Sequence, residues 1–242
     1  MTMRISRTLI VGAGGTGGQL IPPLVRLLNH HPATAMAGVH HPVIVIDGDD
    51  FEDHNQQRQH IGPAQIGRNK ADWTAEFCAS QGLSIESCPQ YLDAALLRQL
   101  LRKDASPVLL VAAVDNDATR KLCIDELLKT NRDFLFISPG NAGAEDPAMA
   151  VKGQVLWFGQ QGDEAIGLNP ALVFPNIEEP QDAAPRYGSC AADAPSSPQL
   201  IAANALAAAY TLAVLQNLLD GAMHTTVSSC FFNGRTFATS AS

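Results

Sequence analysis

The stretch Thr8-Leu-Ile-Val-Gly-Ala-Gly-Gly-Thr-Gly-Gly18 decides the fold of this chain. It joins a short apolar run to a glycine-rich turn, and a helical pattern of leucines follows. Strand, turn and helix in this order are the context in which the G-x-G-x-x-G pattern, here Gly12, Gly14 and Gly17, holds a phosphate. Glycine lets the backbone turn tightly and approach the anion, which the free N–H groups and dipole of the helix attract. A tight turn without a ligand is the alternative that the pattern leaves open.

Two prolines stand inside the helix that is expected after the glycine turn. An interior proline removes a backbone hydrogen bond and collides with the preceding turn. Because of Pro22 and Pro23, we therefore expect this helix to be shortened or kinked. Residues 29–42 follow and are predicted as a surface loop. The four histidines of this loop have no acid or cysteine beside them, which favours solvated side chains over metal ligands.

A strongly polar stretch, Asp47-Gly-Asp-Asp-Phe-Glu-Asp-His-Asn-Gln-Gln-Arg-Gln59, directly follows the apolar run Val43-Ile-Val-Ile46. It therefore lies at the carboxyl end of a predicted second strand. Asp47 stands 30 residues after Gly17, which exceeds the usual spacing of about 20 for a ribose-binding acid. Its place at the end of the second strand still fits that role.

Strands and helices continue to alternate toward the middle of the chain. Residues 83–85 predict a weak third strand, residues 107–114 a central strand and residues 134–137 a fifth. Asp93 is the predicted N-cap of a helix that runs to residue 102, and Asp117 that of a helix over residues 118–130. The alternation predicts a Rossmann-like α/β fold, with a mostly parallel sheet and helices on both faces. Right-handed crossovers then bring the carboxyl ends of the strands to one edge, where such folds bind ligands.

The pattern changes after Asn141. Residues 151–158 predict a strand without a following helix, and residues 159–198 a long loop of little periodicity. An alanine-rich helix over residues 200–219 comes next, and then an antiparallel hairpin whose turn is Asn233-Gly234. We expect a single domain over residues 1–242, with a nucleotide-binding half at residues 1–140 and a closing half at residues 141–242.

Composition excludes several classes of function. The formal net charge of −8 argues against a nucleic-acid surface, which needs clustered Lys and Arg. The charge-free segment 200–219 has the length of a membrane span, but its alanines and polar residues favour a buried helix and no membrane association. The five cysteines lack Cys-x-x-Cys spacing, so no zinc site is expected. Without a visible signal peptide, we expect a reduced, cytoplasmic protein.

The polar residues gathered at the sheet edge fit a nucleoside triphosphate. Arg58 and Lys70 can neutralise phosphate oxygens, and Asp47 can accept hydrogen bonds from ribose hydroxyls. Asp115 follows the central strand and can hold Mg²⁺, which prefers oxygen ligands and bridging phosphates. Asn55 offers neutral donors beside the group that would be transferred. A dehydrogenase would need neither the magnesium carboxylate nor the lysine.

At these positions the sequence resembles the ubiquitin-activating-enzyme-like superfamily, which includes the ThiF, MoeB and HesA adenylyltransferases. Four motifs carry the resemblance, in order over residues 8–140: Gly12-Ala-Gly-Gly-Thr-Gly17, the stretch at residues 47–59, Gly67-Arg-Asn-Lys-Ala71 and Asp115-Asn-Asp-Ala-Thr-Arg120. Within the superfamily the chain looks most like the ThiF-type proteins of bacterial PRTRC gene clusters.

The resemblance implies an ATP- and Mg²⁺-dependent reaction. The C-terminal glycine carboxylate of a ubiquitin-like or sulfur-carrier protein attacks the α-phosphate of ATP, pyrophosphate leaves and an acyl-adenylate forms. The catalytic positions that it implies are Arg58, Lys70, Asp115 and Cys190, with Asp115 as the magnesium ligand. The nucleotide-binding positions that it implies are Gly12, Gly14, Gly15, Gly17, Asp47, Asp49, Asn55, Arg58, Lys70, Asp115 and Asn116.

The resemblance also implies a homodimer and a role for the loop cysteine. In several members a cysteine placed like Cys190 takes the acyl group as a thioester, and Arg186 beside it would favour the thiolate. A bystander in a loop is the other interpretation. The remaining cysteines, expected in the core, are Cys78, Cys88, Cys123 and Cys230.

Two departures from the superfamily pattern bear on activity. Many members receive an arginine from the N-terminal helix of the partner subunit, and here only Arg4 and Arg7 precede the first strand. Either one of them serves or this contribution is missing. The usual Leu before the Arg-Gln pair is replaced by Gln56-Gln57, which can alter contacts with the partner protein.

Two alternatives to the adenylating enzyme stay open. A catalytically silent member of the same fold would act as a nucleotide-binding scaffold or sensor. An NAD-dependent oxidoreductase would explain only the glycine turn and Asp47.

Overall fold

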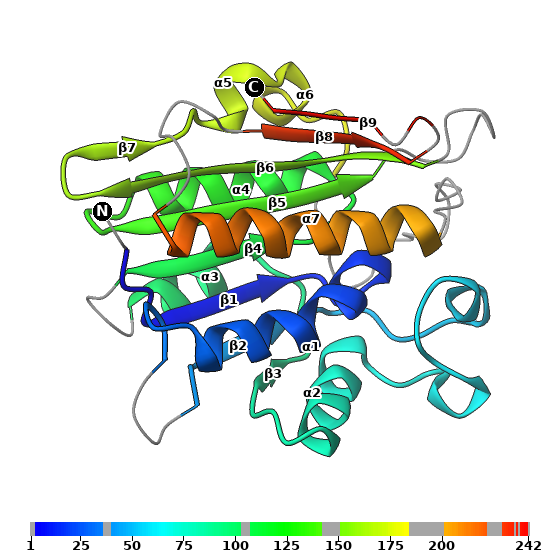
Figure 1. The fold of residues 1–242 in the computed structure, drawn as a ribbon. Coiled ribbons are helices and arrows are strands. Elements are labelled where there is room, and N and C mark those ends of the chain that lie inside the picture. Colours follow the sequence, from blue (N-terminus) through cyan, green and yellow to red (C-terminus); the bar gives the residue numbers. More distant parts are fainter. Residues whose placement is uncertain are drawn as a thin grey trace.

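The computed structural model describes residues 3–35, 40–102, 107–141, 151–183, 201–221, 229–234, 236 and 238–241. These residues form one nine-stranded sheet with the order β3-β2-β1-β4-β5-β6-β8-β9, and β7 pairs with β6 (Figure 1). The predicted Rossmann-like fold class, with a mostly parallel sheet and an antiparallel C-terminal extension, is confirmed.

The first five strands of the chain are parallel, and all except the edge strand are mainly apolar. They are β1 (Arg7–Val11), β2 (Val43–Ile46), β3 (Glu86–Cys88), β4 (Val108–Ala112) and β5 (Phe134–Asn141). Every residue of β1, β2 and β4 is buried, as expected for strands covered on both faces. Antiparallel strands extend the sheet beyond β5: β6 (Lys152–Gln161), β7 (Glu164–Ile166), β8 (Ser229–Asn233) and β9 (Ala238–Ala241).

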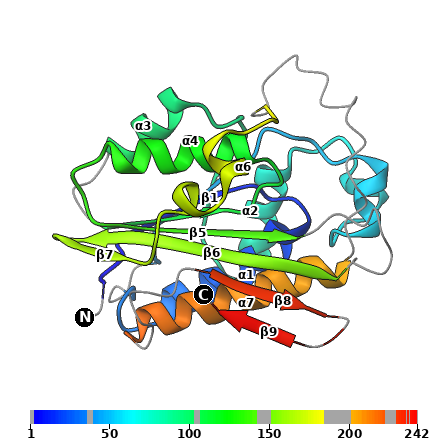
Figure 2. The same ribbon diagram turned by 90° about the horizontal axis from the view of Figure 1, so that it is seen from above.

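Helices cover both faces of the sheet and enclose two apolar cores. One core lies under α1 (Gly15–His30), α2 (Lys70–Ser80) and α7 (Ile201–Leu219). The other lies under α3 (Ala94–Arg102), α4 (Asp117–Leu128) and the short helices α5 (Pro170–Val173) and α6 (Pro175–Glu178). Figure 2 shows α3 and α4 on one side of the strands and α1 and α7 on the other. Two 3-10 turns, η1 (Asp53–Gln57) and η2 (Pro63–Gln65), lie between β2 and α2.

The expectation of a short first helix is wrong. Helix α1 continues through Pro22 and Pro23 and is 16 residues long. Both prolines lie on the outward side of the helix, whereas Leu20, Ile21 and Leu24 of the same turns are fully buried. Burial of a Leu or Ile side chain contributes about 1.5–3 kcal/mol, so the apolar face offsets the cost of the prolines.

Helix α7 matches the predicted buried helix over residues 200–219. Among the described residues it is the one helix long and apolar enough, by length and composition, to cross a membrane. In the structure it packs along α1 and over β5 and β6 (Figure 1). The polar side chains of Asn204 and Thr211 are fully buried on that inner face, which is the environment of a core helix.

Three local expectations differ from the structure by a few residues. The third strand is Glu86–Cys88 rather than residues 83–85, because the polar edge strand pairs with β2 while Leu83 packs into the core. Helix α4 begins one residue early, since the side chain of Asn116, not Asp117, accepts the capping bond from the Thr119 N–H at 2.8 Å. The C-terminal hairpin pairs Asn233 with Ala238, so its loop has four residues rather than two.

Two longer segments also differ from their expectations. β5 continues past Ile137 to Asn141, because its last residues pair with β6. The predicted loop 159–198 contains β7, α5 and α6 in its first part, where Asn169 and Pro170 start a helical turn. Residues 184–200 lie outside the described chain.

Two of the four histidines predicted as solvated are buried instead. His41 is 1% exposed, and its Nε2 lies 3.0 Å from the hydroxyl of Thr8. His31 accepts a bond from the Ala33 N–H through Nδ1 and contacts Asp220 through Nε2 at 2.9 Å. These contacts hold the described residues at the two ends of the segment between α1 and β2. No cluster of metal-binding side chains occurs among the described residues.

The four cysteines among the described residues are free and fall into two groups by burial. Cys78 and Cys123 are fully buried, as predicted, and burial raises the pKa of Cys78 to about 11 and that of Cys123 to about 12. Cys88 and Cys230 are only partly buried on their strands, so the expectation of core packing holds less well for them.

Candidate functional site

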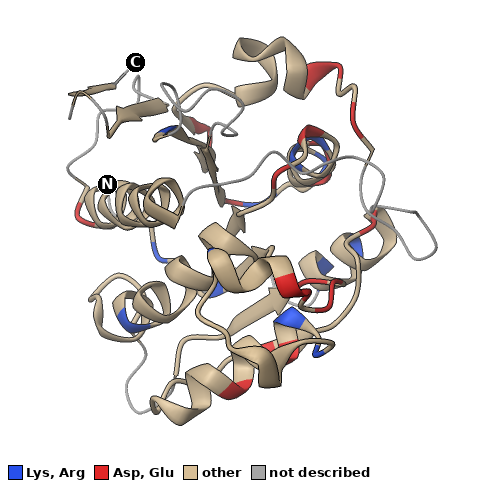
Figure 3. Ribbon diagram, turned by 90° about the vertical axis from the view of Figure 1, so that its right-hand side faces the viewer, with Lys and Arg blue, Asp and Glu red and all other residues tan. Residues whose placement is uncertain are grey.

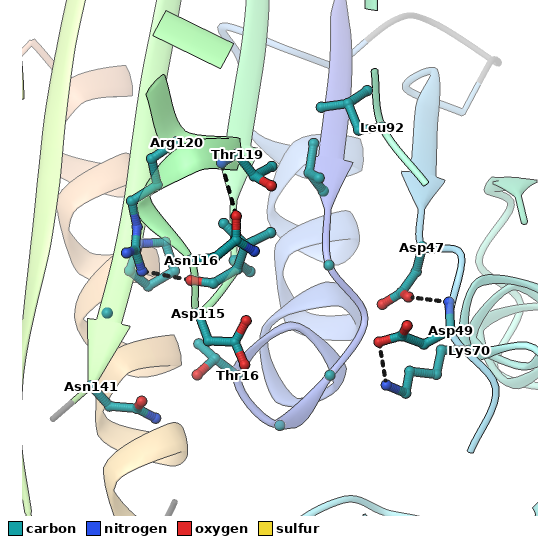
Figure 4. A pocket seen from close by; sticks show the side chains of 18 of the residues that line it. Thr16, Asp47, Asp49, Lys70, Leu92, Asp115, Asn116, Thr119, Arg120 and Asn141 are labelled. Carbon is teal, nitrogen blue, oxygen red and sulfur yellow. Dashed lines mark hydrogen bonds and ion pairs between the residues drawn. The ribbon is translucent and has the colours of Figure 1, made fainter. Parts of the chain in front are cut away.

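A cavity of about 680 Å³ opens at the carboxyl edge of the parallel strands (Figure 4). The glycine turn after β1 forms one wall. The segments after β2, β3 and β4, the end of β5 and the start of β6 contribute to the others. This is the edge where the crossover connections of an open α/β sheet leave room for a ligand. The wall carries four acids and four bases, which are Asp47, Asp49, Asp115 and Asp117 with Arg58, Lys70, Arg120 and Lys152. Figure 3 looks onto this edge and shows both signs of charge on it.

The glycines of the turn have separate structural reasons. Gly12 has φ +94°, and a Cβ there would lie 2.5 Å from the carbonyl oxygen of Ala113. A Cβ on Gly14 would meet nothing within 4 Å, so this position leaves the cavity open for a ligand. A Cβ on Gly17 would overlap the carbonyl oxygen of Gly12, which explains the tight packing of the helix on the strand. At Gly15 the neighbour is a side chain, because a Cβ there would overlap the amide of Asn204 on α7.

Asp47 supports the glycine turn from the second strand. Its Oδ2 accepts a 2.7 Å bond from the Ala13 N–H, and its Oδ1 accepts a 2.9 Å bond from the Asp49 N–H. Burial raises the pKa of Asp47 above its ordinary range, although the nearby Lys70 opposes this. Asp47 therefore fixes the backbone of the turn as well as lining the cavity.

Asp49, Lys70 and Tyr91 form a polar chain on the cavity wall. Lys70 Nζ contacts Asp49 Oδ2 at 2.9 Å, and the Tyr91 hydroxyl donates to Asp49 Oδ1 at 2.7 Å. Burial alone would raise the pKa of Asp49, but the charge and hydrogen bond of Lys70 and the bond from Tyr91 outweigh it and lower that pKa. Lys70 begins α2, whose N-cap Asn69 also donates to the carbonyls of Asp47 and Asp49 at 3.1 Å.

The turn η1 carries Arg58 and Gln59 to the cavity. Nε of Arg58 and Oε1 of Gln59 are buried without a hydrogen-bond partner among the described residues. Asn55 precedes them and is 2% exposed, with its Oδ1 accepting from the Glu52 N–H at 3.0 Å. Asn55 thus shapes the turn and does not line the cavity.

The segment after β4 supplies an exposed carboxylate. Asp115 lies on the cavity wall and makes no hydrogen bond or ion pair with the rest of the described chain. Arg120 reaches the same wall from α4 and donates to Asp117 at 2.6 Å, to the Val114 carbonyl at 2.5 Å and to Ser138 at 3.1 Å (Figure 4). The backbone at residues 114–117 is held in place while the Asp115 carboxylate stays accessible.

Comparison of the sequence with profiles of protein families identifies the family of this chain. The profile of the ThiF family matches residues 2–224. The chain belongs to the ThiF family. No curated protein matches it.

Solved structures of similar fold include nucleotide complexes. PaaA aligns at a TM-score of 0.61 with 15% identity, over 99% of this chain and 64% of that chain. The Escherichia coli MccB structure with ATP aligns at 0.61 with 14% identity, over 99% and 64%. The E. coli tRNA N6-threonylcarbamoyladenosine dehydratase TcdA, in complex with ATP, aligns at 0.58 with 14% identity, over 90% and 87%. The present chain therefore spans less than two thirds of the length of PaaA and MccB.

The structure of this ThiF-family chain brings most of the predicted site residues together. Those that line the cavity are Gly12, Gly14, Gly15, Asp47, Asp49, Arg58, Lys70, Asp115 and Asn116. Gly17 and Asn55 lie behind its wall. Cys190 and Arg186 lie outside the described residues.

Sequence reasoning missed several members of the wall. Gln59 and Arg120 stand inside the quoted motifs, so their spacing could have singled them out. Tyr91 follows a weak strand and carries no motif, and Asn141 and Lys152 join the cavity only because β5 and β6 pair.

Arg7 cannot serve at this site within the same chain. It begins β1 at the amino end of the strand, is 7% exposed and donates to the Leu100 carbonyl at 2.8 Å. Of the two N-terminal arginines, only Arg4 is exposed.

Proposed function

We propose that this protein binds ATP and Mg²⁺ and adenylates a carboxylate, namely the C-terminal glycine of a small ubiquitin-like or sulfur-carrier protein. The observation that carries the proposal is the shared cavity of the glycine turn, the cations Arg58 and Lys70 and the exposed Asp115. Membership of the ThiF family supports it, as do the fold relatives solved with ATP. MccB, one of them, was also solved with AMPCPP and MccA together.

The cavity residues have separate tasks in this reaction. The turn after β1 offers the free N–H groups of the α1 N-terminus to phosphate oxygens, and Gly14 leaves them room. Lys70 and Arg58 would neutralise the phosphates, and Asp47 and Asp49 would accept hydrogen bonds from the ribose hydroxyls. The carboxylate oxygen of the partner attacks the α-phosphorus, the bond to the β-phosphate oxygen breaks and pyrophosphate leaves. Catalysis then consists of alignment and charge neutralisation.

The residues present fit a magnesium ion that is bound mainly through the substrate. Mg²⁺ usually takes one or two protein carboxylates together with phosphate oxygens and water. The exposed Asp115 supplies one such carboxylate on the cavity wall. When bound, the ion would neutralise charge on the phosphates.

Two further parts of the proposal concern assembly and the fate of the acyl group. We propose a homodimer in the cytoplasm, and a transfer in which the Cys190 thiolate attacks the acyl-adenylate and releases AMP. A Cys190→Ala variant that still forms a reducible acyl adduct would remove the cysteine from the reaction. A monomer by light scattering at micromolar concentration would refute the dimer.

The test is ATP–pyrophosphate exchange with candidate carrier proteins that end in glycine. We expect exchange by the wild type, with a loss of about 100-fold or more in Asp115→Ala, because one placed electrostatic group contributes about 3 kcal/mol or more. Asp125→Ala, on the outer side of α4, is the matched control and should retain full exchange. ATP binding without exchange would favour a silent scaffold, and NADH binding without ATP binding would favour an oxidoreductase.

A further inference from the structure

A fully buried asparagine on α7 contacts the glycine turn from behind. Asn204 is 0% exposed, and its Oδ1 accepts a 3.1 Å bond from the Thr16 hydroxyl and a second bond from the Asn141 amide. Thr16 lies in the first turn of α1, and Asn141 is the last residue of β5. Both line the cavity (Figure 4), whereas Asn204 contacts them from behind and does not line it. One side chain thus joins three elements around the site.

The two hydrogen bonds to Oδ1 fix the orientation of the side-chain amide of Asn204. Because Oδ1 faces Thr16 and Asn141, Nδ2 faces Gly15, where a Cβ would overlap it. Nδ2 is buried and has no hydrogen-bond partner among the described residues. A buried donor without a partner costs about 1–3 kcal/mol, and such atoms are rare in folded proteins.

We propose that Asn204 is a positioning residue for the phosphates of the nucleotide, an inference that rests on the function proposed above. Its Oδ1 holds Thr16 and the end of β5 together, so that the N–H groups of the α1 N-terminus face the cavity. The unpaired N–H group of the Asn204 amide points toward the glycine turn. Its partial positive charge adds to that of the α1 N-terminus. The same contact explains why position 15 is glycine, although the G-x-G-x-x-G pattern does not require it.

The test compares ATP and adenosine affinities of three variants. Asn204→Leu keeps the volume but removes both polar functions, and Asn204→Asp keeps the acceptor but replaces the N–H group by an oxygen. We expect both to weaken ATP binding by about tenfold or more, equivalent to about 1.4 kcal/mol, and adenosine binding by less than about threefold. The matched control is Thr211→Val, another fully buried polar residue of α7, whose hydroxyl bonds only within the helix at 2.7 Å to Ala207. It should leave ATP affinity within about twofold.

The outcomes separate this inference from the proposed function. A wild-type protein that binds no ATP would refute both. Wild-type binding with Asn204 variants that match Thr211→Val at equal melting temperature would refute the inference alone. An equal loss for ATP and adenosine would also overturn it, because a role limited to packing does not distinguish the phosphates.

A steric pair keeps the test valid if Asn204→Leu and Asn204→Asp do not fold. We expect Gly15→Ala to weaken ATP binding, since the new methyl group meets the amide of Asn204. Adding Asn204→Ala removes that overlap, so the double variant should bind ATP no more weakly than Asn204→Ala alone. Losses that simply add would contradict the coupling, because residues in contact are expected to be non-additive.

Discussion

Replacing Lys70 by Met removes one partner of a half-buried ion pair on the cavity wall. The Lys70 side chain is 11% exposed, that of Asp49 is 44% exposed, and Nζ lies 2.9 Å from Oδ2. Breaking a fully buried pair costs about 3–5 kcal/mol, and breaking an exposed pair about 0–1 kcal/mol. Because solvent reaches Asp49, we expect a loss of about 2 kcal/mol in the free energy of unfolding. For a chain of this size that lowers the melting temperature by about 4–8 °C.

The destabilisation by Lys70→Met should depend on pH, and the pKa of Asp49 determines whether it grows or shrinks as the pH rises. In the wild type the pKa of Asp49 is lowered, so this group contributes stability above its ordinary pKa of about 3.9. That contribution is lost only as the pH falls through the lowered folded value. In Lys70→Met both contributions of Lys70 are gone, so burial, opposed by the Tyr91 hydrogen bond alone, raises the pKa of Asp49. The variant then loses stability as the pH rises. The difference in melting temperature between the two proteins should therefore grow from pH 4.5 to pH 7.5.

Thermal unfolding followed by circular dichroism at several pH values measures this difference. Lys121→Met is the matched control, since Lys121 forms surface pairs with Asp125 at 3.1 Å and Glu178 at 3.6 Å. It should change the melting temperature by about 2 °C or less at each pH. Adding Asp49→Asn to Lys70→Met should restore part of the lost stability. A loss that is the same at pH 4.5 and pH 7.5, or no recovery in the double variant, would refute the reasoning.

Three further substitutions test other parts of the fold by thermal unfolding. Gly12→Ala places a side chain at φ +94° and against the Ala113 carbonyl, so we expect about 1–3 kcal/mol of destabilisation, and an unchanged melting temperature would contradict it. Pro23→Ala restores an N–H group inside α1 and should stabilise the protein by about 1–3 kcal/mol, whereas a lower melting temperature would mean that the helix needs the proline. Asp182→Ala removes the carboxylate that accepts from the N–H groups of Asp117 and Ala118 at 2.7 and 2.8 Å, which should cost about 0.5–2 kcal/mol, with Gln181→Ala as a neutral control.

The local patterns in the sequence are sufficient to predict the buried parallel strands and the sheet edge. The apolar runs before Gly12, Asp47 and Asp115 are the buried strands β1, β2 and β4, and parallel connections bring their ends together. The same logic brings Lys70 to this edge, because it begins α2, the next α-helix after the polar stretch. These inferences need only periodicity and the handedness of crossovers.

Contacts between distant segments limit what the sequence alone can predict. His41 reads as solvated, yet it is buried because Thr8 lies opposite it on the neighbouring strand. From the sequence, Pro23 is expected to break the helix. Burial of the apolar face of α1 outweighs the free-energy cost of this proline. Asn204 reads as one polar residue in an alanine-rich helix, and nothing nearby in the chain indicates that it meets Thr16. Tertiary burial decides each case, and local propensity carries no information on it.

The Asn204 contact also bears on the order in which the protein acquires its binding site. Thr16 and Asn204 are 188 positions apart in the chain, and bringing such distant residues together is the slow part of folding. During synthesis the strands β1 to β5 leave the ribosome well before α7, so the glycine turn exists for a time without its support. We expect ATP to protect the full chain from proteolysis but to leave a chain ending at Asn141 unprotected. Protection of that shorter chain would show that the turn is formed without α7. If only the full chain is protected, ATP binding reports that synthesis and folding of the C-terminal half are complete.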